Sequence, residues 1–354
     1  MASRALVSTT PRTHVIKNRP LSLPSAILPA IHHHQSYRFI YRSYSIHRIR
    51  HTNPPAPHSQ TTTATLTTAA VMPSTNDFAK TLKALHKPGQ PLIVPNVWDA
   101  PSLYALSCLN ADSADGQKPV AAIATASWAL AHARGAADED LTAEQNLAAV
   151  AELSPLAAAA GLPLSADLQD GYGARIAEVF AAAARSGVAG ANLEDSIPSA
   201  GFGRGIAGSL YPKAEAVERI GAALKAAAEA GVPDFVINAR CDVFKLDAET
   251  PGLDDATRMR EALDRGRAYL AAGATTVFFW GGARGLSTAE VKTLVAELDG
   301  RVAVLLSRRE GAHSTAELAK IGVARISIGP SLYLAAMNAV KTGAAKILAG
   351  GGLA

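Results

Sequence analysis

The stretch that decides the fold is LPLSADLQDGYGARIAEVFAAAARSGVAGANLED, residues 162–195. An apolar run at 162–169 is followed by a long Ala-rich segment that ends at Gly187, and a second apolar run covers 189–195. Glycine is common just after the C-terminus of a helix, so the stretch predicts a strand, a helix and a strand in turn. Such a crossover joins parallel strands. The stretch therefore predicts an α/β protein.

The same alternation continues from about residue 77 to the C-terminus. The expected strands are residues 91–99, 120–128, 162–169, 189–195, 234–242, 275–282, 301–307 and 324–329. Eight βα units in roughly 280 residues predict a (β/α)₈ TIM-type barrel. A doubly wound open sheet, the main alternative, would carry a GxGxxG turn after its first strand, and PNVWDAPS (95–102) has none. We expect residues 77–354 to form one barrel domain.

Residues 1–76 differ in composition from the rest of the chain. They contain no Asp or Glu and 8 Arg and Lys residues. Subtracting these charges from the net +4 leaves about −4 for the remainder. Acid-poor, Arg- and Ser-rich N-termini are typical of transit peptides, so we expect a disordered segment that directs the protein to the mitochondrial matrix. If translation starts at Met72, the expected location is the cytoplasm. The cluster His32–His34 lies in this segment, where no fixed metal site is expected.

Several classes of protein are excluded by composition. The two cysteines, Cys108 and Cys241, are not in a CxxC pattern, which excludes a disulfide framework and a Cys-rich zinc site. No stretch has the length and purity of a membrane span, so we expect no membrane partner. The basic N-terminal segment lacks interleaved aromatic residues and a recognition fold, so we expect no nucleic-acid partner.

Charged residues follow three successive expected strands at the end where barrels carry their active sites. The third strand ends in 167–170, the fourth in 194–195 and the fifth in 240–242. A single acid in such a place usually caps a helix, which is our interpretation of Asp99 and Asp195. Three successive strands that end in this way instead predict a site for a divalent cation and a carboxylate substrate.

The types of donor atom narrow the chemistry of this site. Oxygen ligands without His or Cys favour Mg²⁺, with Mn²⁺ as an alternative, over zinc. Arg240 offers a planar guanidinium that binds a carboxylate or a phosphate group. A cation and an arginine around an oxo acid would stabilise the enolate that forms when a bond alpha to a carbonyl breaks. The sequence therefore predicts an enzyme with a small oxo-acid substrate.

Three motifs, SADLQDGYG (165–173), GVAGANLEDS (187–196) and INARCDVF (237–244), resemble the isocitrate lyase/phosphoenolpyruvate mutase superfamily. PNVWDAPS (95–102) and ELAKIGVARISIGP (317–330) resemble its phosphoenolpyruvate mutase-like branch, also called carboxyvinyl-carboxyphosphonate phosphorylmutase-like. The resemblance implies a phosphoenolpyruvate/pyruvate-domain barrel that depends on Mg²⁺. It also implies cleavage or formation of C–C or P–C bonds in small 2-oxo acids, and usually a homotetramer.

The resemblance implies three kinds of role for individual residues. The metal ligands would be Asp167, Gln169 and Glu194. The catalytic residues would be Arg240, Glu194 and Asp138, of which Asp138 approaches the reacting carbon. The substrate-binding residues would be Ser127, Trp128, Gly171, Tyr172 and Arg240.

Gln169 stands where the family has Asp or Glu. Side chains two apart on a strand share a face, so we expect Asp167 and Gln169 to point together into the barrel mouth. Asp170 would then point away and serve the turn before Gly171 and Gly173. Because glutamine keeps a carbonyl oxygen but has no negative charge, the site is expected to hold Mg²⁺ less tightly.

The segment SIPSAGFGRGIAGSLYPK (196–213) differs from the loops that define the named reactions of the superfamily. It lacks the Cys and His of the isocitrate lyase loop and the Lys-x-Asn pattern of phosphonomutases, and Ala303 replaces an Asn. Because residues 196–209 have few apolar anchors, we expect them to form a mobile lid. We expect a lyase or decarboxylase that cleaves a C–C bond of a small 2-oxo or 2-hydroxy dicarboxylate through a metal-bound enolate. A phosphonomutase-type P–C enzyme and a non-catalytic barrel used for binding or assembly are the alternatives.

Overall fold

The computed structural model describes residues 73–113, 116–247, 250 and 252–352. Residues 1–72 of the expected transit peptide, with the His32–His34 cluster, lie outside the described residues. The described chain begins with α1 (Thr75–Leu85), where the Ser74 hydroxyl accepts a hydrogen bond from the Asp77 backbone at 3.2 Å. Residues 74–76, which the composition assigned to the N-terminal segment, therefore belong to the first helix and its cap.

Within the described residues, nine parallel strands form one sheet that closes into a barrel. They are β1 (Leu92–Val94), β2 (Asn96–Val97), β3 (Ile123–Thr125), β4 (Leu164–Asp167), β5 (Gly190–Glu194), β6 (Val236–Cys241), β7 (Thr276–Phe279), β8 (Val302–Leu305) and β9 (Arg325–Ser327). All eight expected strands are present, and the first is divided at Pro95, which has no N–H for a ladder hydrogen bond. β1 pairs with β9 and β2 with β3, so one short segment closes the barrel. The TIM-type barrel is confirmed.

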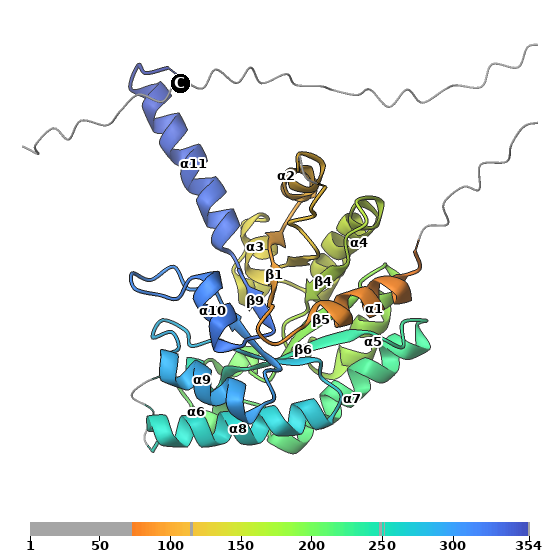
Figure 1. Ribbon diagram of the computed structural model, residues 1–354, viewed down its shortest axis with the longest axis vertical. Coiled ribbons are helices and arrows are strands. Elements are labelled where there is room, and N and C mark those ends of the chain that lie inside the picture. Colours follow the sequence, from red (N-terminus) through yellow and green to blue (C-terminus); the bar gives the residue numbers. More distant parts are fainter. Residues whose placement is uncertain (1–72, 114–115, 248–249, 251, 353–354) are drawn as a thin grey trace, which may run out of the picture. The chain divides into compact units, whose positions relative to one another are not determined.

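Helices follow the strands and surround the barrel (Figure 1). They are α2 (Ala100–Ala111), α3 (Ser127–His132), α4 (Ala143–Ala159), α5 (Ile176–Arg185), α6 (Gly205–Ser209), α7 (Lys213–Glu229), α8 (Asp255–Ala271), α9 (Thr288–Glu297), α10 (Thr315–Ile321) and α11 (Ser331–Leu348). Short 3₁₀ helices are η1 (Asp138–Asp140), η2 (Gly173–Arg175), η3 (Pro198–Ala200) and η4 (Asp242–Lys245). Glycines with positive φ follow five helices, as expected: Gly161, Gly187, Gly231, Gly273 and Gly322. No helix in the described part has the length and apolar character needed to cross a membrane.

The interior of the barrel is polar, in contrast to the apolar core between the sheet and the helices. Asn192, Asn238, Thr276 and Arg325 are all buried. Asn238 Nδ2 donates to Asn192 Oδ1 at 2.8 Å, and the Thr276 hydroxyl donates to Asn238 Oδ1 at 2.7 Å. Buried polar groups that are bonded to one another in this way form a rigid base beneath the strand ends.

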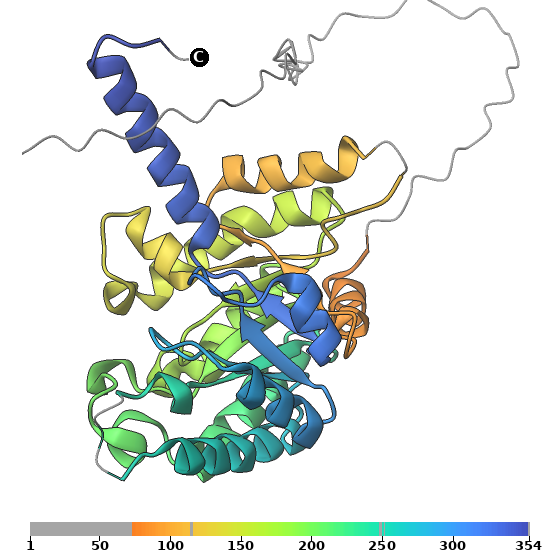
Figure 2. The ribbon, with the colours of Figure 1, turned by 60° about the vertical axis from the view of Figure 1, so that its left-hand side comes forward.

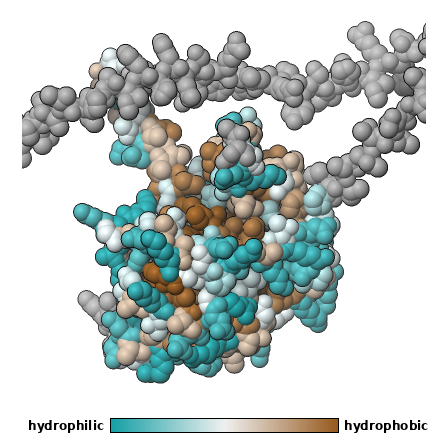
Figure 3. Space-filling model, viewed as in Figure 1, coloured by the Kyte–Doolittle hydropathy of each residue, from teal (hydrophilic) through white to brown (hydrophobic). Residues whose placement is uncertain are grey.

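α11 extends away from the barrel (Figures 1 and 2). At its start, Tyr333 packs edge-on against Trp98, with ring centroids 5.2 Å apart, and against Trp128, with ring centroids 5.9 Å apart. None of the residues of α11 is buried, and Val340 and Leu348 are 64% and 86% exposed. Apolar atoms gather beside the base of this helix (Figure 3). The helix therefore offers an apolar surface that the described part of the chain does not cover.

Candidate active site

A cavity of about 740 Å³ lies at the carboxyl ends of the strands. Five of the expected site residues line it: Ser127, Trp128, Asp138, Asp167 and Arg240. The other four, Gln169, Glu194, Gly171 and Tyr172, do not line it. A neighbouring cavity of about 670 Å³ contains none of the nine. We therefore place the candidate site in the first cavity.

Asp167, the last residue of β4, has two differently used carboxylate oxygens. Its Oδ2 accepts hydrogen bonds from the backbone N–H and the hydroxyl of Ser127, at 3.0 and 3.1 Å. Its Oδ1 is buried and has no hydrogen-bond partner. Burial, and then the nearby Asp138 carboxylate, raise the pKa of Asp167 above its usual range. A buried carboxylate with one free oxygen beside a second acid is suited to binding a cation.

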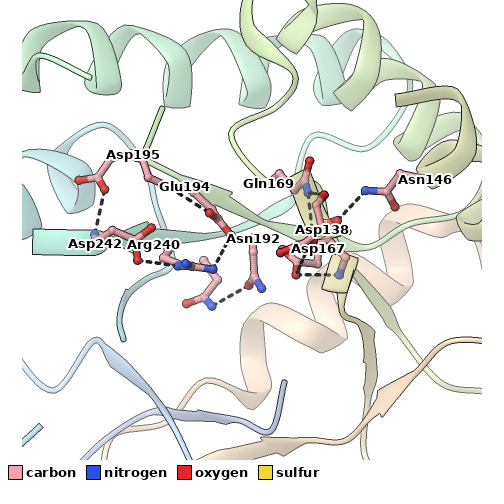
Figure 4. Close-up of polar contacts among 12 residues, drawn as sticks. Asp138, Asn146, Asp167, Gln169, Asn192, Glu194, Asp195, Arg240 and Asp242 are labelled. Atoms are coloured by element: carbon pink, nitrogen blue, oxygen red, sulfur yellow. Dashed lines mark hydrogen bonds and ion pairs between the residues drawn. The ribbon is translucent and has the colours of Figure 1, made fainter. Parts of the chain in front are cut away.

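Gln169 does not continue β4, so the shared face expected for Asp167 and Gln169 is wrong. The strand ends at Asp167, and Gln169 has a left-handed φ of 52°. The alternation of side chains holds only within a strand, and this turn redirects the glutamine. Gln169 Nε2 donates to the backbone oxygen of Asp138 at 2.8 Å and to its Oδ1 at 3.1 Å (Figure 4). The side-chain amide N–H groups of Gln169 thus hold Asp138 at the cavity.

Asp170 is a turn residue, as expected. Its carboxylate accepts hydrogen bonds from the backbone N–H groups of Tyr172 and Gly173, at 2.9 and 3.1 Å. Gly171 has a φ of 80°, and a Cβ at this position would lie 2.9 Å from the Ile176 side chain, so the turn requires glycine.

Tyr172 supports Asp167 from behind the cavity wall. Asn146 Nδ2 donates to the Tyr172 hydroxyl at 2.8 Å and to the backbone oxygen of Asp167 at 2.9 Å. Asn146 is fully buried. Tyr172 is therefore placed to fix the end of β4, at some remove from a ligand in the cavity.

Arg240 lies on the cavity wall and is fixed by two acids. Its Nη1 donates to Glu194 Oε1, and its Nε donates to Asp242 Oδ1 at 2.8 Å (Figure 4). Its Cζ lies 4.6 Å from the centroid of the Trp280 ring. Burial raises the pKa of Glu194 to about 8, and Asp242 adds to this effect while Arg240 opposes it. Burial alone would lower the pKa of Arg240, but Asp242 and Glu194 outweigh it and raise that pKa, so the guanidinium stays charged.

Asp99 and Asp195 have structural partners. Asp99 accepts a hydrogen bond from the Ser102 backbone at 2.8 Å and caps α2, as expected. Asp195 does not cap the helix that follows its strand, but its Oδ1 accepts a hydrogen bond from the Asp242 backbone at the start of η4, at 2.9 Å. Its Oδ2 accepts a hydrogen bond from the Tyr269 hydroxyl at 2.7 Å and lies 3.3 Å from Arg265 Nη1.

The loop 196–209 is folded against the barrel more firmly than its sequence indicated. It contains η3 and α6, and both Phe202 and Ile206 pack against the core. Lys245 Nζ lies 3.5 Å from the centroid of the Phe202 ring and 4.2 Å from that of Trp280. Phe202 and Ile206 anchor the loop next to Trp280, the residue that covers Arg240, and the movement of the loop as a lid stays a prediction.

Asn96, Arg325 and Ser327 are among the cavity residues that the sequence analysis did not identify. Arg325 and Ser327 belong to the expected strand 324–329 and stand two residues apart, which places both on one face. A charged residue between apolar neighbours in a barrel strand was the signal that could have identified this pair.

The residues present fit a cation that is held mainly by water and substrate. Among the described residues, no group of three or more His, Cys, Asp or Glu side chains is placed to bind a metal. Mg²⁺, however, commonly keeps several waters and binds one or two carboxylates together with oxygens of the substrate. The free Oδ1 of Asp167 meets this requirement as a single carboxylate ligand. Glu194 is engaged by Arg240 and lies behind the cavity wall.

Residues 82–348 match the phosphoenolpyruvate phosphomutase family. The chain belongs to this family. An uncharacterized protein of Mycobacterium tuberculosis H37Rv is 30% identical to this chain over 257 residues. The matched region covers 72% of this chain and 84% of that protein. A 2,3-dimethylmalate lyase of Eubacterium barkeri is 35% identical over 132 residues, or 36% and 41% of the two chains. The crystal structure of a candidate phosphonomutase from Burkholderia cenocepacia J2315 is 37% identical, with a TM-score of 0.64, over 75% of this chain and 98% of that one. The superfamily contains lyases and mutases, which supports an enzyme.

Proposed function

We propose that this protein is an Mg²⁺-dependent lyase that cleaves a C–C bond of a small 2-oxo or 2-hydroxy dicarboxylate through an enolate. The observation that carries the proposal is the free, buried Oδ1 of Asp167 in the same cavity as the Arg240 guanidinium. The first is suited to a cation and the second to a carboxylate. The similarity to a 2,3-dimethylmalate lyase supports cleavage of a C–C bond.

Arg240 binds the carboxylate next to the reacting carbon. Because Asp242 and Glu194 hold its guanidinium and Trp280 covers one face, its direction is fixed before the substrate arrives. A fixed donor stabilises charge that develops at the substrate without reorganising during the reaction.

Asp138 takes the proton. With a 2-hydroxy dicarboxylate, the hydroxyl proton passes to the Asp138 carboxylate as the O–H electron pair forms the new C=O. The C–C bond breaks, and its electron pair passes to the departing acid as an enolate. The enolate carbon then takes the proton from Asp138, which restores the Asp138 carboxylate. Gln169 keeps Asp138 in place for this step through its two hydrogen bonds.

Asp167 and Ser127 prepare the site for a cation. The two hydrogen bonds from Ser127 occupy Oδ2 and leave Oδ1 for the ion. When bound, Mg²⁺ would supply positive charge that stabilises the enolate.

A panel of 2-hydroxy dicarboxylates, each incubated with the protein and Mg²⁺, tests this function. We expect at least one member to release an oxo acid, detectable by its reaction with a hydrazine reagent, and EDTA to stop the release. Oxo acids such as pyruvate should compete. A protein that binds neither pyruvate nor oxalate at millimolar concentration with Mg²⁺ does not have this function.

A P–C bond enzyme is the second candidate, because Arg308 and Arg309 line the same cavity and could hold a phosphonate. Two other basic residues are unsuited to this role: Lys213 lies 2.5 Å from Asp264 on the surface, and neither Lys213 nor Arg204 lines the cavity. A ³¹P NMR assay with phosphonopyruvate distinguishes this candidate from the lyase, since only a P–C bond enzyme would change the phosphorus signal.

We also propose a homotetramer located in the mitochondrial matrix. The exposed apolar residues of α11 support self-association, because a second chain could cover them. The acid-free composition of residues 1–76 supports the location.

A further inference from the structure

We propose that Arg325, Ser327 and Asn96 form a second anion-binding subsite at the floor of the cavity, which takes the distal carboxylate of a dicarboxylate ligand. This inference deepens the proposed function and rests on it, because it concerns the same cavity. It adds a reason for the enzyme to prefer a substrate with two carboxylates over one with a single carboxylate.

The guanidinium of Arg325 crosses the interior of the barrel. It starts on β9, and its Nη2 lies 3.4 Å from Ser165 Oγ on β4 and 3.4 Å from Asn192 Oδ1 on β5. These two residues stand two positions before Asp167 and Glu194 in their strands, so they share the same face one step deeper in the barrel. Arg325 therefore lies beneath the layer of acids and forms part of the cavity floor.

Most of the hydrogen-bonding capacity of the floor is unused. Arg325 is only 1% exposed, yet its Nε and Nη1 have no partner, and no described carboxylate lies within 4.0 Å of its guanidinium nitrogens. Ser327 Oγ and Asn96 Oδ1 are also buried without partners. A buried charge with free donors is costly unless a ligand or water satisfies it. All three residues line the cavity, so the unpaired groups belong to its wall.

The chemistry of the free groups selects an anion. Arg325 provides two N–H groups and a positive charge, and Ser327 provides a hydroxyl. Burial lowers the pKa of Arg325 only to about 10, so it stays protonated at neutral pH. Asn96 Nδ2 is held by the backbone oxygen of Thr125 at 2.7 Å, which leaves its Oδ1 to accept from a hydroxyl or a water. A carboxylate, with an adjacent hydroxyl or water, satisfies this set.

Two cations then face the ligand, Arg240 and Arg325, and each has a distinct role. A monocarboxylate such as pyruvate can use only one of them, whereas malate can use both. The ratio of malate affinity to pyruvate affinity therefore measures the contribution of the Arg325 subsite. The pyruvate affinity alone measures binding at Arg240 and the cation.

Calorimetric titration of malate and of pyruvate, each with Mg²⁺, tests this anion-binding subsite in the wild type and four variants. Arg325→Met keeps the length of the side chain and removes its charge, Arg325→Lys restores the charge, and Ser327→Ala removes only a hydroxyl. Arg267→Met is the matched control, since Arg267 pairs with Glu297 at 2.5 Å on the surface, outside the cavity. Arg325→Met removes a buried charge that has no described carboxylate within 4.0 Å and gives up only the two long hydrogen bonds to Ser165 and Asn192, so we expect the variant to fold and to melt close to the wild type.

We expect Arg325→Met to weaken the affinity for malate by about tenfold or more and to leave the affinity for pyruvate within about threefold of the wild-type value. Arg325→Lys should recover part of the malate affinity, Ser327→Ala should lose a smaller part, and Arg267→Met should match the wild type. If Arg325→Met does not fold, a Ser327→Ala variant with unchanged malate affinity overturns the proposal. Wild-type affinity for malate in Arg325→Met, an equal loss of malate and pyruvate, or no malate binding by the wild type also overturns it. If the wild type binds malate through Arg325 but binds neither pyruvate nor oxalate, the Arg325 subsite is supported and the proposed function is refuted.

Discussion

The side-chain amide nitrogen of Gln169 donates to both the backbone oxygen and the carboxylate of Asp138, at 2.8 and 3.1 Å. An acid in place of Gln169 would put a second negative charge against Asp138 and would remove both hydrogen bonds. The glutamine therefore exchanges a possible metal ligand for a donor that positions the neighbouring acid.

Exchanging the hydrogen-bond donor at 169 and the acceptor at 138, by Gln169→Glu and Asp138→Asn, tests this relationship. Gln169→Glu should destabilise the metal-free protein by about 1.5–3 kcal/mol, because a hydrogen bond to a charged group is lost and two carboxylates repel. Adding Asp138→Asn should restore part of this stability, since an asparagine amide can donate to Glu at 169. Urea unfolding without Mg²⁺ measures both variants. A double variant that is no more stable than Gln169→Glu would show that the contact does not hold the loop.

Asp170→Asn should affect folding and leave cation binding unchanged. The carboxylate of Asp170 accepts hydrogen bonds from the backbone of Tyr172 and Gly173 and, at 2.7 Å, from the Tyr211 hydroxyl. Replacing one of its oxygens by an amino group should cost about 1–3 kcal/mol of stability. Thermal melting and Mg²⁺ titration in the presence of pyruvate provide the two readouts. Loss of cation affinity in a folded Asp170→Asn protein would place Asp170 in the metal site.

The stability of the protein should fall with pH because of Glu194. Burial raises its pKa from 4.5 to about 8 in the folded state. Stability from such a group is fully present below the unfolded pKa and is lost as the pH rises through the folded pKa, here from about 4.5 to about 8. Glu194→Gln does not titrate, so the stability of the wild type relative to this variant should decline over that range. Urea unfolding of both proteins at pH 5, 6.5 and 8 checks this, and a relative stability that rises with pH would contradict it.

The exposed apolar residues of α11 predict an oligomer. The purified protein should behave as a tetramer in light scattering at micromolar concentration, because Val340 and Leu348 would otherwise stay in water. A Val340→Glu, Leu348→Glu double variant should form smaller species. Lys292→Glu, an exposed change on α9, serves as the control. A monomeric wild type at this concentration would refute the prediction.

The barrel and the cluster of acids could be predicted from the sequence because both depend on repeated patterns. Each strand is a short apolar run, each is followed by a helical segment that ends near glycine, and strand ends meet at one rim. Asp167 and Arg240 reach the same cavity for this reason, whereas Asp138 reaches it from η1. No local conformational detail is needed for that result.

The orientations of Gln169 and Arg325 could not be predicted in the same way. The glutamine lies two residues beyond the end of β4, and its left-handed backbone means that the two-residue alternation of a strand does not describe its direction. The arginine lies in the expected last strand, but only the closed barrel shows that its side chain reaches Ser165 and Asn192 on the opposite wall. Both depend on where the chain turns or closes, which the two-residue period does not describe.

The most direct test of the central claim is a calorimetric titration of pyruvate into the wild type and Asp167→Asn, each with Mg²⁺ and with EDTA. Asparagine keeps the shape of Asp167 and removes its charge, so the variant should fold while losing its hold on the cation. We predict that the wild type binds pyruvate only with Mg²⁺ and that Asp167→Asn binds it in neither condition. Equal binding by the wild type with Mg²⁺ and with EDTA, or unchanged Mg²⁺-dependent binding by Asp167→Asn, would contradict the claim that this cavity is a cation-dependent oxo-acid site.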